Sequence, residues 1–190
     1  MKTFLFILIG LAAVLFVAKM IYMVSTAMVV RSTRGALYVS TTRKRISACL
    51  DAVSAKKGDT WIDLGCGDGR VLRQARKQYG INAIGYEINP LAYLKARLYC
   101  LFHPGIRIRM QNFFKADLSH ADIVSCYLFP DVMHDLAQKL THELKPGAFI
   151  ISFNFNLPGL VPDQVLRPAG SLHSDPIYIY RIPAPQKIRR

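Results

Sequence analysis

The stretch that decides the fold is Asp63-Leu64-Gly65-Cys66-Gly67-Asp68-Gly69-Arg70. It follows a short apolar run at residues 61–64 and leads into residues 71–77, whose apolar spacing is that of an amphipathic helix. Glycine has no Cβ, so alternate glycines let the backbone turn sharply and let a ligand lie against bare amides at a helix N-terminus. The sequence therefore predicts a strand, a glycine turn and a helix, an arrangement typical of nucleotide-type binding sites.

A second acidic position follows the next apolar run. Residues 81–86 predict a strand, and Glu87 closes it at the point where an acid would accept hydrogen bonds from a ribose diol. The glycine spacing is G-x-G-x-G, whereas a dinucleotide site needs G-x-G-x-x-G, and Asp63 and Asp68 flank the turn. Two carboxylates would repel a pyrophosphate but suit a ligand with an ammonium and a sulfonium, which predicts S-adenosylmethionine. The alternative is a glycine turn in some other α/β protein, with Glu87 in solvent.

The rest of the chain alternates between helical and extended patterns, as in a doubly wound domain. We expect helices at residues 40–53, 71–77, 90–102 and 131–144, and strands at residues 61–64, 81–86, 106–111, 122–127 and 148–155. Residues 164–167 and 177–182 predict a closing hairpin. Arg70, Arg73, Arg76 and Lys77 are expected on the solvated face of the helix after the glycine turn. The predicted fold class is α/β, a Rossmann-like sheet with helices on both faces.

The N-terminus predicts one transmembrane helix before this sheet. Residues 4–30 carry a single charge, Lys19, and exceed the roughly 20 apolar residues that cross a bilayer. A cleavable signal peptide is the alternative, but the run is long and lacks a clean A-x-A site. Lys2 stands on one side, whereas several cations follow on the other: Arg31, Arg34, Arg43, Lys44 and Arg45. By the positive-inside rule, the domain after the helix faces the cytoplasm.

The chain carries 25 Lys and Arg against 12 Asp and Glu, a net charge of +13. The basic residues gather beside the apolar segment and at the C-terminus, and no nucleic-acid module is recognisable. We therefore expect anionic lipid headgroups as partners, and no nucleic acid. The four cysteines are scattered without a C-x-x-C pair, which predicts neither a metal site nor a disulfide framework.

Several further segments point to one family. They are Tyr38-Val39-Ser40-Thr41-Thr42, Gly-Tyr-Glu-Ile-Asn-Pro at 85–90, Tyr-Leu-Phe-Pro at 127–130, and Leu-Lys-Pro-Gly at 144–147 leading into Ile-Ser-Phe-Asn-Phe. With the glycine motif and the apolar helix, they resemble the class I S-adenosylmethionine-dependent methyltransferases. Within that class the chain is similar to the membrane-anchored protein-lysine methyltransferases typified by those of the ATP synthase c-subunit and the adenine nucleotide translocase, together with their prokaryotic relatives. Ser40 and Asn154 depart from the family pattern, at positions where relatives commonly have proline and where many show histidine and aspartate.

The resemblance implies Nε-methylation of a lysine on a membrane protein. It divides the chain into a transmembrane anchor (1–30), a basic juxtamembrane segment with a lead-in helix (31–57), a methyltransferase domain (58–183) and a basic tail (184–190). No Asn-Pro-Pro-Tyr or Asp-Pro-Pro-Tyr follows strand four, which disfavours planar amide and nucleobase acceptors. Two alternatives stay open: a methyltransferase for a lipid, quinone or other membrane-dissolved small molecule, and a non-catalytic cofactor-binding protein.

The motifs and the resemblance together name the site residues. The expected cofactor contacts are Asp63, Gly65, Cys66, Gly67, Asp68, Gly69 and Glu87, then Asn112 and Phe113 beside the adenine, and Tyr38 with Thr41 or Thr42 closing over the ligand. Because an uncharged amine must attack the methyl group, groups that keep lysine deprotonated are expected past strand four. Tyr127, Asp131 and His134 are the candidates there, and no metal is expected.

Overall fold

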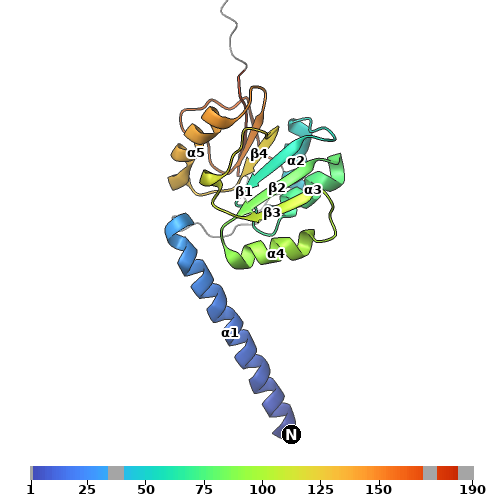
Figure 1. Cartoon of the computed structure of the whole chain (residues 1–190), viewed down its shortest axis with the longest axis vertical. Coiled ribbons are helices and arrows are strands. Elements are labelled where there is room, and N and C mark those ends of the chain that lie inside the picture. Colours follow the sequence, from blue (N-terminus) through green and yellow to red (C-terminus); the bar gives the residue numbers. More distant parts are fainter. Residues whose placement is uncertain (1, 34–40, 169–174, 184–190) are drawn as a thin grey trace, which may run out of the picture.

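A computed structural model of the chain describes residues 2–33, 41–168 and 175–183. Tyr38 and the tail from residue 184 lie outside these residues. The first element, α1 (Lys2–Thr33), is a single long helix that projects away from the domain (Figure 1). Its segment Thr3–Val24 is long and apolar enough to cross a membrane, and none of that segment is buried by the rest of the protein.

The domain is built on a seven-stranded sheet with the order β3-β2-β1-β4-β5-β7-β6. The parallel strands are β1 (Thr60–Leu64), β2 (Asn82–Glu87), β3 (Ile106–Met110), β4 (Ile123–Cys126) and β5 (Phe149–Phe153). Two antiparallel strands complete the sheet: β6 (Gln164–Leu166) and β7 (Ile177–Arg181). The predicted strands and the closing hairpin are therefore confirmed.

Helices cover both faces of the sheet. On one face, α2 (Arg43–Ala52), α3 (Arg70–Tyr79) and α4 (Pro90–Cys100) pack around one buried cluster that includes Trp61. On the other face, α5 (Pro130–Glu143) and residues 116–121 enclose a second cluster that includes Ile62 (Figure 1). Adjacent residues of β1 thus point into different cores, as in parallel strands that are buried on both faces.

The strand order places a ligand crevice at the end of the central strand. The connections after β1 and β2 lead toward β3, whereas β4 and β5 extend the sheet on the other side of β1. Ligands of open α/β sheets bind at such a switch point, beyond the carboxyl ends of the strands. In the sheet register, Asp63 lies opposite Gly85 of β2 and Ser125 of β4. The acidic glycine turn therefore begins at this crevice.

Candidate active site

The glycine turn is folded back over the end of β2. The amides of Gly65 and Cys66 both donate to the carbonyl oxygen of Tyr86, at 2.9 and 3.0 Å, and the Gly69 amide donates to the Cys66 carbonyl at 2.8 Å. Gly69 caps the N-terminus of α3 with φ +72°, in the left-handed region that glycine adopts at no steric cost. The turn therefore presents close-packed backbone at the start of a helix, which suits close approach of a ligand.

Glu87 is held rigidly at the end of β2 by three backbone amides. Its Oε2 accepts from Gly67 N at 2.9 Å, and its Oε1 accepts from Ile88 N at 2.9 Å and Asn89 N at 2.8 Å. Burial raises the pKa of the Glu87 carboxyl, and the amide hydrogen bonds oppose this shift. One carboxylate thus joins the glycine turn to the start of α4.

Asp63 lies beneath the turn in a buried polar chain. Trp61 Nε1 donates to Ser125 Oγ at 2.8 Å, and Ser125 Oγ donates to Asp63 Oδ1 at 2.6 Å. Burial raises the pKa of Asp63 to about 7, against the Ser125 hydrogen bond, and the nearby charges of Glu87 and Asp68 raise it further. A cation that reached this carboxyl would favour its ionised form and lower its pKa again.

Asp68 forms a two-pronged ion pair that the sequence did not predict. Arg70 Nε donates to Asp68 Oδ1 at 3.0 Å and Arg70 Nη2 to Oδ2 at 2.8 Å. Burial alone would raise the pKa of Asp68, but the hydrogen bonds and charge of Arg70 outweigh it and lower that pKa. Arg70 keeps about a third of its side chain exposed, so it lies partly in solvent as expected but is fixed by Asp68. Arg76 is also half-buried, and its Nη1 donates to the carbonyls of Gly80 and Ile81 at 2.8 and 2.7 Å.

The Cys66 side chain points away from the crevice and into the core. A Cβ on Gly85 of the neighbouring strand would lie 2.6 Å from Cys66 Sγ, so the thiol occupies the space that this glycine leaves. Burial raises the pKa of the Cys66 thiol well above its ordinary value. Cys66 therefore presents its backbone, and not a reactive thiolate, to the site.

The residues expected near an adenine follow β3 and lie close to Glu87. The Gln111 amide donates to the Glu87 carbonyl at 3.2 Å. Asn112 then caps a short helix, η1 (Phe113–Lys115), with its Oδ1 accepting from Phe114 N at 2.9 Å. The half-buried rings of Phe113 and Phe114 lie 4.6 Å apart. Aromatic rings therefore lie where an adenine is expected, although the Asn112 side-chain oxygen already accepts a hydrogen bond from the backbone.

The start of α2 reaches the glycine turn from the other side. Thr41 is buried, and its carbonyl accepts from Arg70 Nη1 at 3.5 Å. Thr42 is exposed and caps α2, with its side chain accepting from Arg45 N at 3.4 Å. Thr41 is therefore the threonine nearer the acidic turn, and Tyr38 lies outside the described residues.

A second polar cluster lies past β4 and β5, and it contains residues that sequence reasoning missed. Asn154 Nδ2 donates to Tyr127 Oη at 2.7 Å and to Asp175 Oδ2 at 3.1 Å, while Asn154 Oδ1 accepts from Arg45 Nη2 at 2.6 Å. Arg45 is only 5% exposed, and its guanidinium stacks over the Phe153 ring at 5.6 Å. The expectation that Arg45 is a membrane-facing cation is therefore wrong.

Two other residues, expected to keep the attacking lysine deprotonated, lie on α5. Asp131 and His134 are both exposed near the start of that helix, and His134 Nε2 lies 3.1 Å from Gln138 Nε2, one turn further on. The cluster at Tyr127 is instead assembled from α2, the residues just past β4 and β5, and Asp175. The polar groups that lie together with Tyr127 past the ends of β4 and β5 are therefore those of Arg45, Asn154 and Asp175.

Comparison with known proteins identifies this arrangement. The ANTKMT methyltransferase domain family matches residues 63–164, more than half of the chain. A protein-lysine N-methyltransferase of Saccharolobus islandicus (strain REY15A) is 33% identical over 150 residues, which cover 76% of this chain and 92% of that protein. The chain belongs to the ANTKMT methyltransferase family. The human lysine N-methyltransferase of the ATP synthase c-subunit is another relative, 31% identical over 166 residues that cover 84% of this chain and 69% of that protein.

A solved structure supports the cofactor of this ANTKMT-family chain. An RNA methyltransferase from Salinibacter ruber, in complex with S-adenosyl-L-homocysteine, aligns with a TM-score of 0.71 and 29% identity, covering 80% of this chain and all of that one. The chain is thus an S-adenosylmethionine-dependent methyltransferase, as its acidic glycine turn predicts. The site fits that ligand, because a glycine turn without Cβ atoms, a fixed Glu87 and a buried Asp63 converge at the carboxyl ends of β1 and β2.

Proposed function

We propose that the chain transfers a methyl group from S-adenosylmethionine to the Nε atom of a lysine on a membrane protein. The observation that carries the proposal is the likeness to a relative named a protein-lysine N-methyltransferase, which covers about nine-tenths of that relative's length. The human relative is named for a component of ATP synthase, which supports a membrane-embedded protein as the acceptor.

The cofactor contacts we propose follow from the geometry of the turn. Glu87 accepts hydrogen bonds from the ribose hydroxyls, and Asp63 faces the ammonium group. The floor of the cofactor site is formed by Gly65, Gly67, Asp68, Gly69 and the backbone of Cys66. Asn112 and Phe113 flank the adenine, and Thr41, with Thr42 and Tyr38, closes the site from the side of α2. Gly65 supports this placement, because a Cβ there would meet Leu128 Cδ2 at 3.1 Å, so the turn and the segment after β4 already lie in contact.

The acceptor side must hold a lysine amine in its neutral form. When bound, S-adenosylmethionine supplies a methyl group activated by the sulfonium. Tyr127 and Asn154 offer neutral polar groups at the adjoining edge, and the nearby Arg45 guanidinium disfavours a second positive charge. These residues orient the amine for in-line attack, and positioning supplies most of the acceleration. Asp131 and His134 stay as outer candidates for removing the proton.

We also propose that α1 anchors the enzyme in a bilayer. The 22 residues of Thr3–Val24 form a helix of about 33 Å, close to the roughly 30 Å hydrocarbon core. Lys19 lies near one end of that segment, from which its amine can extend to the interface. Arg31, Arg34, Arg43 and Lys44 follow the span, which supports a domain on the cytoplasmic side, near anionic headgroups. The four-part division at residues 30, 57 and 183 is part of this proposal.

One experiment tests the acceptor class. Membranes from cells with and without the full-length chain are incubated with methyl-labelled S-adenosylmethionine, and label is followed into protein, solvent extract and RNA. We expect label in protein, and peptide mapping should find a lysine heavier by one or more methyl groups. The Asp63→Asn variant should give no labelled protein. The control variant is Asp117→Asn, which changes an exposed carboxylate in a surface loop and should keep the label. Label that runs only with the solvent extract would show a lipid or quinone acceptor.

RNA is the second candidate acceptor, because the Salinibacter ruber protein is described as an RNA methyltransferase. The net charge of +13 is compatible with either acceptor. Label that disappears with ribonuclease but survives protease would favour RNA and overturn the lysine proposal.

Alkaline carbonate extraction and N-terminal sequencing test the anchor. A chain that stays in the membrane with residues 1–30 intact supports a span, whereas a mature chain that begins beyond them reveals a signal peptide. Protease protection of the domain in sealed vesicles then reports which side it occupies.

A further inference from the structure

The outer side of α4 is the least expected surface of the domain. Leu94 and Leu98 are 53% and 59% exposed, and Phe102, just past the helix, is 87% exposed. Leu94, Leu98 and Leu101 follow the i, i+4, i+7 spacing of one helical face, and all three are exposed. The opposite side of α4 packs on the sheet through small residues, Ala96 and Cys100. The helix thus has a second apolar stripe that the domain itself does not cover.

The stretch of sequence that contains this stripe carries charge of one sign. Between Glu87 and Asp117 the sequence contains no acid, whereas it contains Lys95, Arg97, Arg107, Arg109 and Lys115. All five cations are exposed. We define the α4 surface as the apolar residues Leu94, Leu98, Leu101 and Phe102, together with Tyr99, Lys95 and Arg97. Leucine and aromatic residues on one face with lysine and arginine beside them are the composition of helices that lie in a membrane interface.

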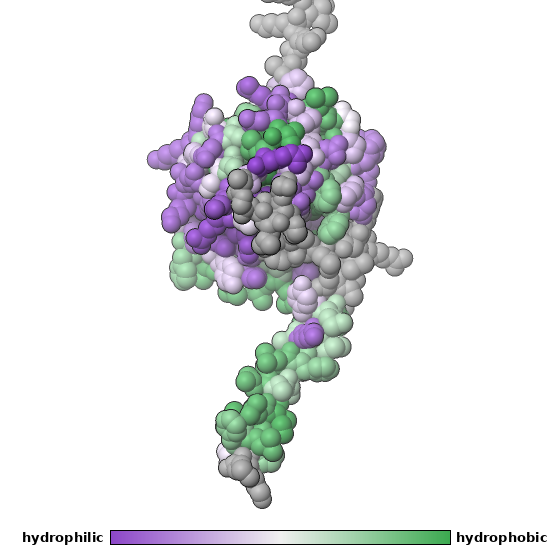
Figure 2. Space-filling model, turned by 180° about the vertical axis from the view of Figure 1, so that it is seen from behind, coloured by the Kyte–Doolittle hydropathy of each residue, from purple (hydrophilic) through white to green (hydrophobic). Residues whose placement is uncertain are grey.

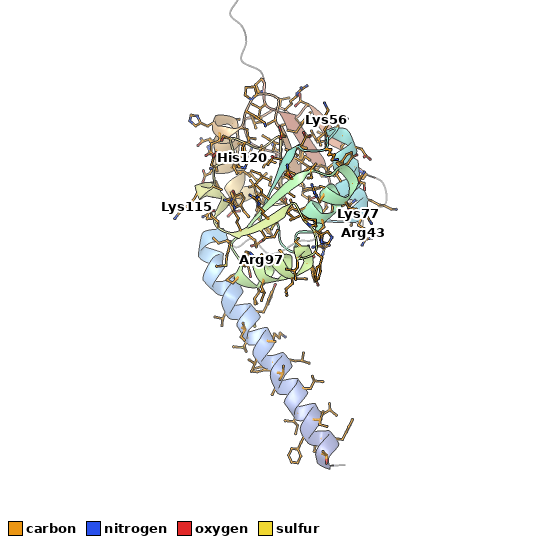
Figure 3. All side chains as sticks on the ribbon, turned by 45° about the vertical axis from the view of Figure 1, so that its right-hand side comes forward. Arg43, Lys56, Lys77, Arg97, Lys115 and His120 are labelled. Carbon is orange, nitrogen blue, oxygen red and sulfur yellow. The ribbon has the colours of Figure 1, made fainter. Side chains whose placement is uncertain are left out.

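The position of the α4 surface relative to α1 points to the same partner. α4 is in contact with α1, and it lies along the edge of the domain from which α1 projects (Figure 1). Seen from behind, hydrophobic side chains gather along that lower edge, next to the helix (Figure 2). Arg97 and Lys115 lie toward the α1 end of the domain, whereas Lys56 lies at the far end (Figure 3). The exposed apolar residues and two of the cations therefore adjoin the proposed span.

We propose that the α4 surface rests on the same bilayer that α1 crosses, with its leucines among the acyl chains and its cations at anionic headgroups. The inference rests on α1 spanning the membrane, as proposed above. A protein partner or a second copy would also bury apolar residues, but exposed leucines with Lys95 and Arg97 beside them, in a stretch of sequence without acids and next to a span, fit a phospholipid surface best.

This contact would set the orientation of the active site. Asn89, two residues after Glu87, caps α4, so the N-terminal end of the helix lies at the cofactor crevice. A helix of 11 residues is roughly 16 Å long, so a docked α4 holds the crevice within about that distance of the headgroups. The enzyme would then reach lysines near the membrane surface and not those of distant soluble segments.

Tryptophan fluorescence in proteoliposomes tests the contact with the full chain. The only native tryptophan, Trp61, is completely buried and gives the same background in every variant. Three single variants each add one reporter: Phe16→Trp in α1, Leu98→Trp on the α4 surface, and Val161→Trp at a 90% exposed position of the β5–β6 loop. The vesicles contain phosphatidylcholine and phosphatidylglycerol with brominated acyl chains, which quench indoles within the bilayer.

We expect the added fluorescence of the Phe16→Trp and Leu98→Trp variants to fall by about half or more, because an interfacial helix buries its apolar face roughly 5–10 Å deep. The Val161→Trp variant should be unaffected. Quenching of the Phe16→Trp variant but not of the Leu98→Trp variant would overturn the α4 inference and leave the span intact. Lack of quenching in both would overturn the span itself. Protection of the Leu98→Trp indole from both bromine and aqueous iodide would instead show that protein covers the α4 surface, and would equally overturn the inference.

Discussion

The guanidinium of Arg45 donates a 2.6 Å hydrogen bond to Oδ1 of Asn154, a residue 109 positions later in the chain. Asn154 has φ +69°, in the left-handed backbone region that residues other than glycine rarely adopt. Its amide nitrogen donates onward to Tyr127 Oη at 2.7 Å. Asn154 therefore connects the lead-in helix to the end of β4, and its unusual backbone aims the amide at both partners. Strained residues of this kind concentrate at functional sites.

Replacement of Asn154 separates the backbone contribution from that of the amide. Asn154→Ala loses the hydrogen bonds and keeps a Cβ at positive φ, so we expect a loss of about 2–3 kcal/mol in the free energy of unfolding. Asn154→Gly loses the same bonds but removes the backbone strain, and should be more stable than the alanine variant by about 1 kcal/mol. Urea denaturation of both variants measures this difference.

The two Asn154 variants also test the acceptor-side role. Both should lower kcat for methyl transfer while the affinity for S-adenosylhomocysteine stays within about twofold of the parent, because Asn154 contacts the cluster at Tyr127 and not the glycine turn. Weaker ligand binding with unchanged kcat would place Asn154 on the cofactor side and contradict its assignment.

The stability of the protein should depend on pH through Asp63. Its pKa is about 7 when folded, raised chiefly by burial, and about 4 when unfolded. Between these values the folded state binds more protons, so the free energy of unfolding should fall as the pH rises from about 4 to 7 and level off above. Asp63→Asn still accepts from Ser125 and should flatten this dependence. An unchanged slope in the variant would show that other groups cause it.

The same carboxyl should control the affinity for ligands that carry an ammonium. If the Asp63 carboxylate pairs with the amino group of S-adenosylhomocysteine, calorimetry should show binding roughly tenfold tighter at pH 7.5 than at pH 5.5, as Asp63 ionises. Adenosine lacks that group and serves as the control ligand, with no such gain. Equal pH dependence for both ligands would remove Asp63 from the proposed ammonium site.

A ligand analogue can test the proposed contact between Glu87 and the ribose. Wild-type protein should bind the 2′-deoxy analogue of S-adenosylhomocysteine about tenfold more weakly, since a hydrogen bond to a charged group contributes about 1.5–3 kcal/mol. In Glu87→Gln, which also weakens the three amide contacts, the penalty for the missing hydroxyl should shrink to within about twofold. A penalty that persists undiminished would mean that another residue reads the ribose.

The cofactor side of the site was predictable from sequence because it is local. The glycine turn follows β1, and Glu87 ends the adjoining strand β2. The hydrogen bond from Gly67 N to Glu87 spans only 20 residues of sequence. The strands were equally predictable, because short apolar runs buried on both faces differ clearly from the helical spacing between them.

The residues on the side of the site that would receive the lysine could not be predicted from sequence in the same way. This side joins Arg45, Tyr127, Asn154 and Asp175, which are far apart in the sequence, and a positive φ at a residue other than glycine leaves no sequence signal. One clue was available for Arg45. It lies four residues before Cys49, on the same helical face as that buried residue, so its phase in α2 distinguished it from the exposed Lys44.

Gly85 is not among the predicted site residues, yet the structure leaves no room for a side chain at this position. A Cβ at this position would lie 2.6 Å from Cys66 Sγ and 2.8 Å from Leu72 Cδ1, so Gly85→Ala should destabilise the protein by about 1–3 kcal/mol and weaken cofactor binding by displacing the turn. Cys66→Ala removes the nearer atom, so in the double variant the penalty for Gly85→Ala should fall by at least about 0.5 kcal/mol. Thermal denaturation of the two single variants and the double variant measures the coupling, and strictly additive effects would show that the thiol of Cys66 does not fill the space above Gly85.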